Sequence, residues 1–332
     1  MSLSVRESTP PGSTSLSSDA KRDSEPTTHW VAQGSVADLP IWTNAFVGDG
    51  GTDLDLECDT GICATERRCG EWAIRTVVVP AASSMPGRGF ERATRQAYRR
   101  LLLDIPHGNL LRAWNFVPRI NDSAEDHVEN GSADRPDRRD RYMAFNAGRF
   151  QSFQDIYEDP AWFPVASGVG HAGEDLILHL LHGDGLPRPV DNPRQVLPAE
   201  YSEKFGALPP AFIRAATIQS PAGEFILVSG TASVVGEDSA HAENFDLQLE
   251  ETLDNLTVVV EACRAGFTPG HLDHWLVYLP DGTRREEVLA AVERRWLGHQ
   301  IEIEFRVQNL CRPELLVEIE AAGLAVGTGG GS

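Results

Sequence analysis

The stretch GEFILVSGTASVV at residues 223–235, with FDLQLEETLDNLTVVVEACRAG at 245–266 close behind it, decides the fold. The first segment is rich in β-branched and aromatic residues and predicts a pair of strands with a turn at Gly230. The second predicts a long helix that ends at Gly266, a typical C-terminal cap. Apolar side chains recur in it at helical spacing, at Leu249, Leu253, Leu256, Val260 and Cys263. Together they predict a helix packed on one face of a sheet.

The chain after this unit continues with the same alternation of strands and helices. The sequence predicts a strand at 271–279 and a helix at 281–298, with Thr283 and Glu286 as a capping box. Two further strands follow at 301–310 and 310–321. In the last strand Leu315, Val317 and Ile319 alternate with Leu316, Glu318 and Glu320.

The N-terminal half runs in the same order as the C-terminal half. Its elements are expected as strand, helix, strand, helix and strand at 72–80, 90–103, 109–121, 136–157 and 174–183. We therefore predict an α+β (α/β) fold of two tandem β-α-β-α-β lobes that arose by internal duplication. The expected ranges are a disordered tail (1–27), a first lobe (28–186), a Pro-rich connector (187–210), a second lobe (211–326) and a flexible tail (327–332).

Composition narrows the classes of partner. The chain has 332 residues, with 41% hydrophobic and 23% charged residues, as in globular proteins. It has neither an apolar run long enough to span a membrane nor the apolar segment of a signal peptide, so we expect a cytoplasmic protein. The formal charge of −20 argues against binding to nucleic acid or anionic lipid. A small anionic ligand would therefore need a local arginine pocket.

Cysteine and histidine spacing does not favour a metal site. The chain has five cysteines, and the cluster Cys58, Cys63 and Cys69 lacks CxxC spacing, so we expect free thiols rather than disulfides or zinc. His179 and His182 lie three residues apart in a predicted strand and should point to opposite faces. No phosphate-binding loop is recognisable, and no metal or organic cofactor is predicted.

Seven segments, taken in their order along the chain, resemble the chorismatases, which are similar to two RidA/YjgF-like lobes fused in one chain. They are LRAWNFVPRIN (111–121), RYMAFNAGRFQSF (141–153), PVASGVG (164–170), PPAFIRA (209–215), LVSGTASVVG (227–236), QLEETLDNL (248–256) and CRPELLVEIEA (311–321). The resemblance implies cleavage of the enolpyruvyl ether of chorismate, with release of pyruvate and no cofactor. Its branches differ in the ring product, which is 3-hydroxybenzoate, both 3- and 4-hydroxybenzoate, or a dihydroxycyclohexadiene carboxylate formed by hydrolysis.

The resemblance also implies roles for two residues of the last segment. Glu318 corresponds to the acid that protonates the enol ether, a role that suits a carboxyl group in a dry cleft. Glu320, on the same face, is the alternative. Cys311, seven residues before Glu318, is typical of the branch that forms 3-hydroxybenzoate. From the residues alone, Glu318 could equally face water, and Cys311 could be a small buried apolar residue.

Arginine side chains are the expected ligands for the two carboxylates of chorismate. We select Arg149 and Arg214, with Tyr201 as a hydroxyl donor and Ala232 as the small residue that separates the branches. Solvent exposure of Arg149 and connector packing of Tyr201 and Arg214 remain open alternatives. A RidA-like metabolite-binding module or imine deaminase is the competing class, with Arg312 as its carboxylate ligand. In either class a monomer with internal pseudo-symmetry is expected.

Overall fold

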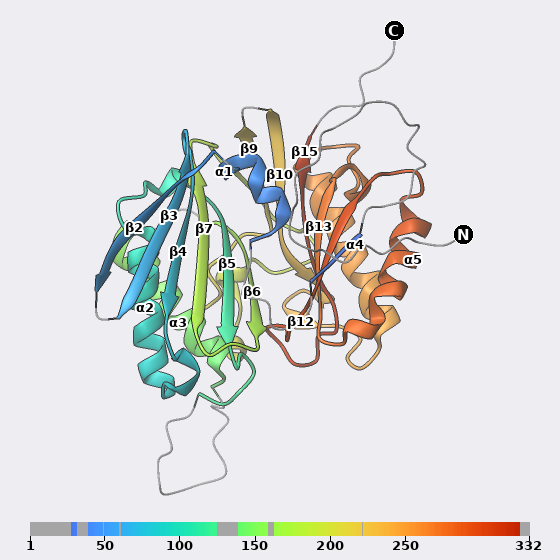
Figure 1. The fold of residues 1–332 in the computed structure, drawn as a ribbon. Helices are drawn as coiled ribbons and strands as arrows, with labels where there is room; N and C mark the ends of the chain where they lie inside the picture. Colours follow the sequence, from blue (N-terminus) through green and yellow to red (C-terminus); the bar gives the residue numbers. More distant parts are fainter. Residues whose placement is uncertain are drawn as a thin grey trace, which may run out of the picture.

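The computed structural model describes residues 28–31, 39–48, 50–59, 61–124, 139–158, 163–220 and 222–325. The tails expected at 1–27 and 327–332 lie outside these ranges. In Figure 1 the elements form two lobes side by side, each a sheet with helices packed on it. No helix in the described ranges is long and apolar enough to cross a membrane.

The first lobe is a six-stranded sheet with the order β2-β3-β4-β7-β5-β6. Helices α2 and α3 pack against each other and against one face of this sheet through a core that includes Phe90, Tyr98 and Phe145. The elements are β2 (Thr52–Asp59), β3 (Ile62–Cys69), β4 (Trp72–Val79), α2 (Gly87–Leu102), β5 (Leu110–Pro118), α3 (Arg141–Tyr157), β6 (Val165–His171) and β7 (Leu176–Gly183).

The second lobe is a seven-stranded sheet with the order β1-β14-β13-β15-β10-β9-β8, covered by α4 and α5. Its elements are β1 (Thr28–Val31), β8 (Arg188–Val190), β9 (Ala215–Ser220), β10 (Gly223–Ala232), α4 (Phe245–Cys263), β13 (His274–Leu279), α5 (Arg285–Arg295), β14 (Glu302–Val307) and β15 (Glu318–Leu324). A small hairpin, β11 (Val234–Val235) and β12 (Asp238–Ser239), stands beside it. The short helices are α1 (Asn44–Val47) and 3₁₀ turns at Ile41–Thr43, Ala82–Ser84, His107–Asn109, Pro198–Glu200, Glu203–Phe205, Pro269–His271 and Gly282–Arg284.

The same strand order occurs in both sheets. In the first it runs β3-β4-β7-β5-β6, and in the second β9-β10-β15-β13-β14. In each, only the last of these neighbouring pairs is parallel, β5 with β6 and β13 with β14. Helices α2 and α4 follow the equivalent strands β4 and β10, while α3 and α5 follow β5 and β13. The prediction of an α+β fold with two tandem lobes is therefore confirmed.

The two lobes meet through an apolar core between the sheets. It contains Trp42, Trp114, Phe225 and Tyr278, so aromatic side chains from both lobes are buried together. The backbone also joins the lobes, because Gly170 N donates to Asn309 O over 2.7 Å. The helices lie on the outer faces, which gives the order helices, sheet, sheet, helices.

Several element boundaries differ from the sequence predictions. The expected turn at Gly230 is wrong, because β10 runs unbroken from Gly223 to Ala232 and only its pairing with β15 shifts near this point. The last strand begins at Glu318 rather than 310, and the segment before it is irregular. The helix expected at 136–157 begins at Arg141, and Asp140 caps it by accepting from Met143 N.

The ranges expected for the lobes also differ in part from the sheets. Strand β1, placed in the first lobe by its position in the sequence, pairs with β14 of the second sheet. Strand β8 lies within the expected connector and pairs with β9. Both strands belong to the second lobe because of their pairing in its sheet, which their positions in the sequence do not reveal.

The expectation of free thiols is wrong for Cys58 and Cys63. These residues face each other across the hairpin of β2 and β3, with a Cα–Cα distance of 4.4 Å, and form a disulfide. Cys69, Cys263 and Cys311 are free. No hairpin was predicted at residues 52–69, so nothing indicated that these two cysteines lie side by side.

Candidate active site

A cavity of about 220 Å³ lies where the two lobes and the connector meet. Its wall comes from the start of α3, the segment between Tyr201 and Arg214, the end of β10 with Val234, and the run 311–315 before β15. Five of the six predicted site residues line it: Glu318, Cys311, Arg214, Tyr201 and Ala232. Residues far apart in the sequence thus form one site between the lobes, as pockets at such interfaces commonly do.

Glu318 is the first residue of β15 and lies at the wall of the cavity. It pairs with Ala232 of β10 on one side and with Tyr278 of β13 on the other. Its residue is only 4% exposed. Burial raises the pKa of Glu318 to about 8, and the charge of Glu320 adds to the rise, while Arg112 and Arg214 oppose it. At neutral pH the carboxyl group is therefore mostly protonated and able to donate.

Gly230 makes room for this carboxyl group. A Cβ atom at position 230 would lie 1.9 Å from Glu318 Oε1, far inside van der Waals contact. The glycine that the sequence suggested as a turn is instead required by the close approach of a side chain from the neighbouring strand.

Cys311 reaches the cavity from the irregular segment before β15. Burial raises the pKa of the Cys311 thiol to about 12, with Glu318 adding to the rise. Tyr142 of α3 also lines the cavity, and burial raises its pKa well above the ordinary range. Both side chains are therefore neutral at working pH, and Cys311 has no thiolate character.

Arg214 and Tyr201 form the basic side of the cavity. Arg214 Nη2 donates to the Tyr201 hydroxyl over 2.6 Å and to Val196 O over 3.4 Å. Its Nε has no hydrogen-bond partner within the described residues, although Arg214 is only 8% exposed. Because the Tyr201 oxygen accepts from Arg214, its own proton remains available to a ligand.

Arg149 does not line the cavity. It is 3% exposed, and its guanidinium carbon lies 5.3 Å from the centre of the Tyr98 ring. It follows Tyr142 by seven residues, so it lies on the same face of α3 but about 10 Å further along the helix. The predicted direct contact of Arg149 with a ligand therefore finds no support in the cavity. Glu320, the alternative acid, also lies outside the lining.

Two further cationic side chains line the mouth. The guanidinium of Arg312 stacks 3.9 Å from the centre of the Phe205 ring and donates to Glu237 O over 2.9 Å. Lys204 lies 3.0 Å from a carboxylate oxygen of Glu237. With Glu318 protonated, the lining carries three cations (Lys204, Arg214 and Arg312) and two anions (Asp140 and Glu314).

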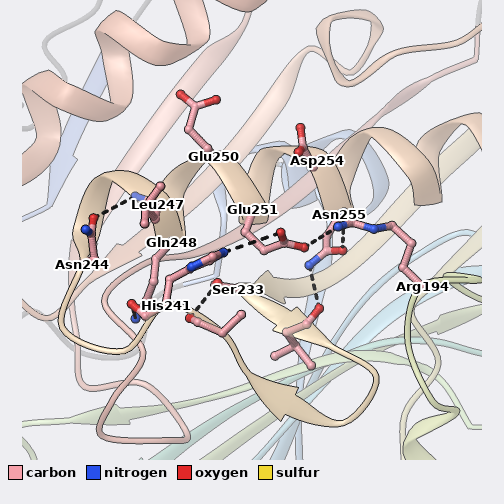
Figure 2. A network of polar contacts seen from close by, with 12 residues as sticks. Arg194, Ser233, His241, Asn244, Leu247, Gln248, Glu250, Glu251, Asp254 and Asn255 are labelled. Atoms are coloured by element: carbon pink, nitrogen blue, oxygen red, sulfur yellow. Dashed lines mark hydrogen bonds and ion pairs between the residues drawn. The ribbon is translucent and has the colours of Figure 1, made fainter.

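Helix α4 holds two parts of this wall in place and also binds the connector, and part of this network is seen in Figure 2. Gln248 donates to Glu314 O and accepts from Leu316 N, both over 2.8 Å, which fixes the segment before β15. Asn255 donates to the carbonyls of Ala232 and Val234 over 3.1 and 2.9 Å. Glu251 and Asn255 both accept from Arg194 of the connector.

Comparisons with known proteins place this site in a family. Residues 58–182 match the family model described as Chorismatase FkbO/Hyg5-like, N-terminal. The chain is 31% identical over 254 residues to a 3-hydroxybenzoate synthase of Streptomyces hygroscopicus, covering 72% of each chain. The chain belongs to the chorismatase family.

Two other relatives agree with this assignment. A chorismatase of Streptomyces hygroscopicus is 32% identical over 222 residues, which cover 64% of this chain and 60% of that one. A crystal structure of a chorismatase matches with a TM-score of 0.66 and 26% identity, covering 80% of this chain and 78% of that chain. The family and the two-lobed fold expected from the sequence are thus confirmed.

Sequence reasoning did not select Tyr142, Phe212 or Gly230, which also line the cavity. All three lie within segments that carry the family resemblance, but nothing in their spacing distinguishes them from packing residues. Within the described residues, no group of three or more His, Cys, Asp or Glu side chains is arranged to hold a metal ion.

Proposed function

We propose that this protein is a chorismatase that cleaves the enolpyruvyl ether of chorismate to pyruvate and 3-hydroxybenzoate, with Glu318 as the general acid. The observation that carries the proposal is a protonated carboxyl group on the wall of a small cavity between the lobes. A carboxyl group of pKa about 8 is still neutral at pH 7, and this is the state that can protonate carbon.

The reaction begins with transfer of the Glu318 proton to the terminal methylene of the enol ether. The ether carbon becomes an oxocarbenium ion, and a hydroxyl group of the ring captures it or water does. When the ring hydroxyl captures the ion, the bond between the ring and that hydroxyl oxygen and the original bond between the ether oxygen and the former oxocarbenium carbon both break; pyruvate leaves, and loss of a ring proton yields the aromatic acid. Capture by water gives the dihydroxycyclohexadiene carboxylate instead. Chorismate contains the same atoms as pyruvic acid and hydroxybenzoic acid together, so aromatisation consumes neither water nor an oxidant.

The charges of the cavity suit a dicarboxylate. Arg214 has an unpaired Nε and the hydroxyl of Tyr201 beside it, a pair suited to one carboxylate. Arg312 at the mouth supplies positive charge for the second, whereas Lys204 is already paired with Glu237 and Asp238. Local cations thereby attract an anion into a protein whose formal charge is −20.

Cys311 and Ala232 are the proposed determinants of the ring product. Both line the cavity together with Glu318, where they can contact the ring and its hydroxyl group. Because the Cys311 thiol is neutral, we assign it the placement of the ring and exclude a role as a nucleophile. Aromatisation requires that the ring hydroxyl captures the cation before water does, and a close-fitting wall favours that outcome.

The test is to incubate the purified protein with chorismate, to follow pyruvate by a coupled NADH assay and to separate ring products by chromatography. The proposal expects equal amounts of pyruvate and 3-hydroxybenzoate. The dihydroxycyclohexadiene carboxylate would indicate the hydrolytic branch, and 4-hydroxybenzoate beside the 3-isomer would indicate mixed ring chemistry. Absence of pyruvate release would favour the metabolite-binding module.

One chain supplies every wall of this cavity, and we therefore propose that it acts as a monomer. Light scattering at the assay concentration checks this: activity that disappears on dilution of a dimer would contradict it.

A further inference from the structure

Glu320 is a buried carboxylate directly behind the proposed acid. It follows Glu318 by two residues on β15, so both side chains leave the same face of the strand. Glu320 is 3% exposed, and the cavity does not reach it. A buried carboxylate on the face of the acid, yet without access to the ligand, calls for a role other than donation.

Three donors hold the Glu320 carboxylate, and two of them come from the other lobe. Arg112 Nη2 lies 2.7 Å from Oε2, and Trp114 Nε1 donates to the same oxygen over 3.0 Å. The Tyr278 hydroxyl donates to Oε1 over 3.0 Å. Both oxygens of the Glu320 carboxylate are therefore engaged, one by a guanidinium and an indole and the other by a phenol.

The Glu320 carboxylate is held by a guanidinium and two further donors beside an acid whose pKa is raised by burial, and the charge of Glu320 adds to that rise. We propose, on the basis of the proposed function above, that Glu320 is a positioning residue whose fixed charge keeps the acid Glu318 in its protonated state. Arg112 and Trp114 of the first lobe thus hold a carboxylate that lies beside an acid of the second lobe.

The other groups that face Glu318 do not replace this effect. Arg112 and Arg214 act in the opposite direction, since a nearby cation favours the ionised carboxylate. Cys311 and Tyr142 are neutral at working pH. Glu320 is therefore the source of negative charge that favours the protonated acid, in addition to burial.

Arg306 of β14 completes the surroundings of Glu320. Its positive charge is already matched by Glu304, whose carboxylate lies 2.5 Å from its Nη2. Glu320 also interacts electrostatically with Arg306, so both guanidinium groups belong to the surroundings of this carboxylate.

The pH profile of kcat/KM for pyruvate release tests the proposal. The wild-type rate should fall as the pH rises through the pKa of Glu318, because the acid must be protonated. In Glu320→Gln the charge is lost and this descending limb should move to lower pH by about one unit or more. A folded Glu320→Gln enzyme whose descending limb coincides with that of the wild type would overturn the proposal and leave Glu320 a purely structural role.

A second variant controls for misfolding of Glu320→Gln. Glu320→Gln alone leaves Arg112 buried without its counter-ion, whereas Glu320→Gln with Arg112→Met exchanges the buried pair for neutral side chains of similar size. The double variant should also shift the limb to lower pH, but by less, because the opposing effect of Arg112 is removed as well. A limb at the wild-type position in the double variant would likewise refute the proposal.

Glu66→Gln is the matched control. Glu66 is buried and paired with Arg75 over 2.8 Å, but it lies on β3, three strands away from β5. Glu66→Gln should lose stability but keep the descending limb of the pH profile at its wild-type position. An equal shift of the limb in Glu66→Gln and Glu320→Gln would show that the loss of any buried carboxylate moves it. Glu318→Gln separates the two hypotheses, because retained activity in that variant refutes the proposed acid, whereas an unshifted limb in Glu320→Gln refutes only its positioning.

Discussion

Replacing Glu318 with glutamine removes one proton and leaves the shape of the side chain almost unchanged. With a pKa of about 8, Glu318 holds its proton in roughly nine molecules of ten at pH 7. An exposed glutamate of pKa about 4.3 would be protonated in only about one molecule of 500 at the same pH. At pH 7 the protonated fraction of Glu318 is thus several hundred times larger than that of an exposed glutamate.

The glutamine amide is far too weak an acid to protonate the enol ether. We therefore expect kcat for pyruvate release to fall by about 10²–10⁴-fold, the usual contribution of a positioned acid. The coupled NADH assay measures the loss, and Glu293→Gln, which changes an exposed residue of α5, is the matched control and should retain wild-type kcat. Near-normal pyruvate release from Glu318→Gln would refute the mechanism.

Glu318→Gln should also change how the free energy of unfolding depends on pH. The folded protein binds the Glu318 proton more tightly than the unfolded chain, so the wild type loses stability as the pH rises from about 4.5 to about 8. Glutamine does not titrate, and the variant should gain stability relative to the wild type by on the order of 3 kcal/mol between pH 5 and pH 8. Urea unfolding at the two pH values measures this difference. A constant difference would show that the pKa of Glu318 is not raised.

Three further substitutions test other parts of the cavity. Gly230→Ala places a methyl group 1.9 Å from Glu318 Oε1, so kcat should fall by at least about tenfold because the acid is displaced; unchanged kcat would contradict the close approach. Cys311→Ala should retain pyruvate release and shift the ring product from 3-hydroxybenzoate towards the hydrated diene, as seen by chromatography; an unchanged product would remove Cys311 as a determinant. Arg214→Ala should lower kcat/KM by at least about tenfold through the loss of a charge-assisted hydrogen bond. Arg119→Ala, at an exposed pair with Asp122, should have no effect, and equal effects at both arginines would show that Arg214 is not a ligand.

Periodic segments of the sequence were sufficient to predict the two lobes. Helices α2 and α4 show clear apolar spacing, and the strands β4, β7 and β13 are apolar runs bounded by turn residues. Strands β2 and β3 were missed because they carry many charged and polar residues, as expected where one face of an edge hairpin meets solvent.

Most of the predicted site residues that line the cavity come from segments that carry the family resemblance, and Tyr201 of the connector is the exception. Glu318 and Cys311 were selected by their positions in one short segment, and both line the cavity. Arg149 was selected because it is an arginine in a segment that carries the resemblance, and helical geometry places it two turns beyond Tyr142. Gly230 lies against Glu318, and Arg112 pairs with Glu320, only after the chain has folded. No local sequence pattern predicts either contact.

The two lobes repeat one strand order, but their equivalent strands are under different selective constraints. The strand of the first lobe that corresponds to β15 is β7, which reads LILHLLHG and carries no carboxylate. Selection on β7 therefore acts through packing and the buried contacts of His179 and His182, whereas the proposed function adds turnover to the selection on β15. A library randomised over β7 should be screened for soluble folded protein, while one randomised over β15 must also be screened for product.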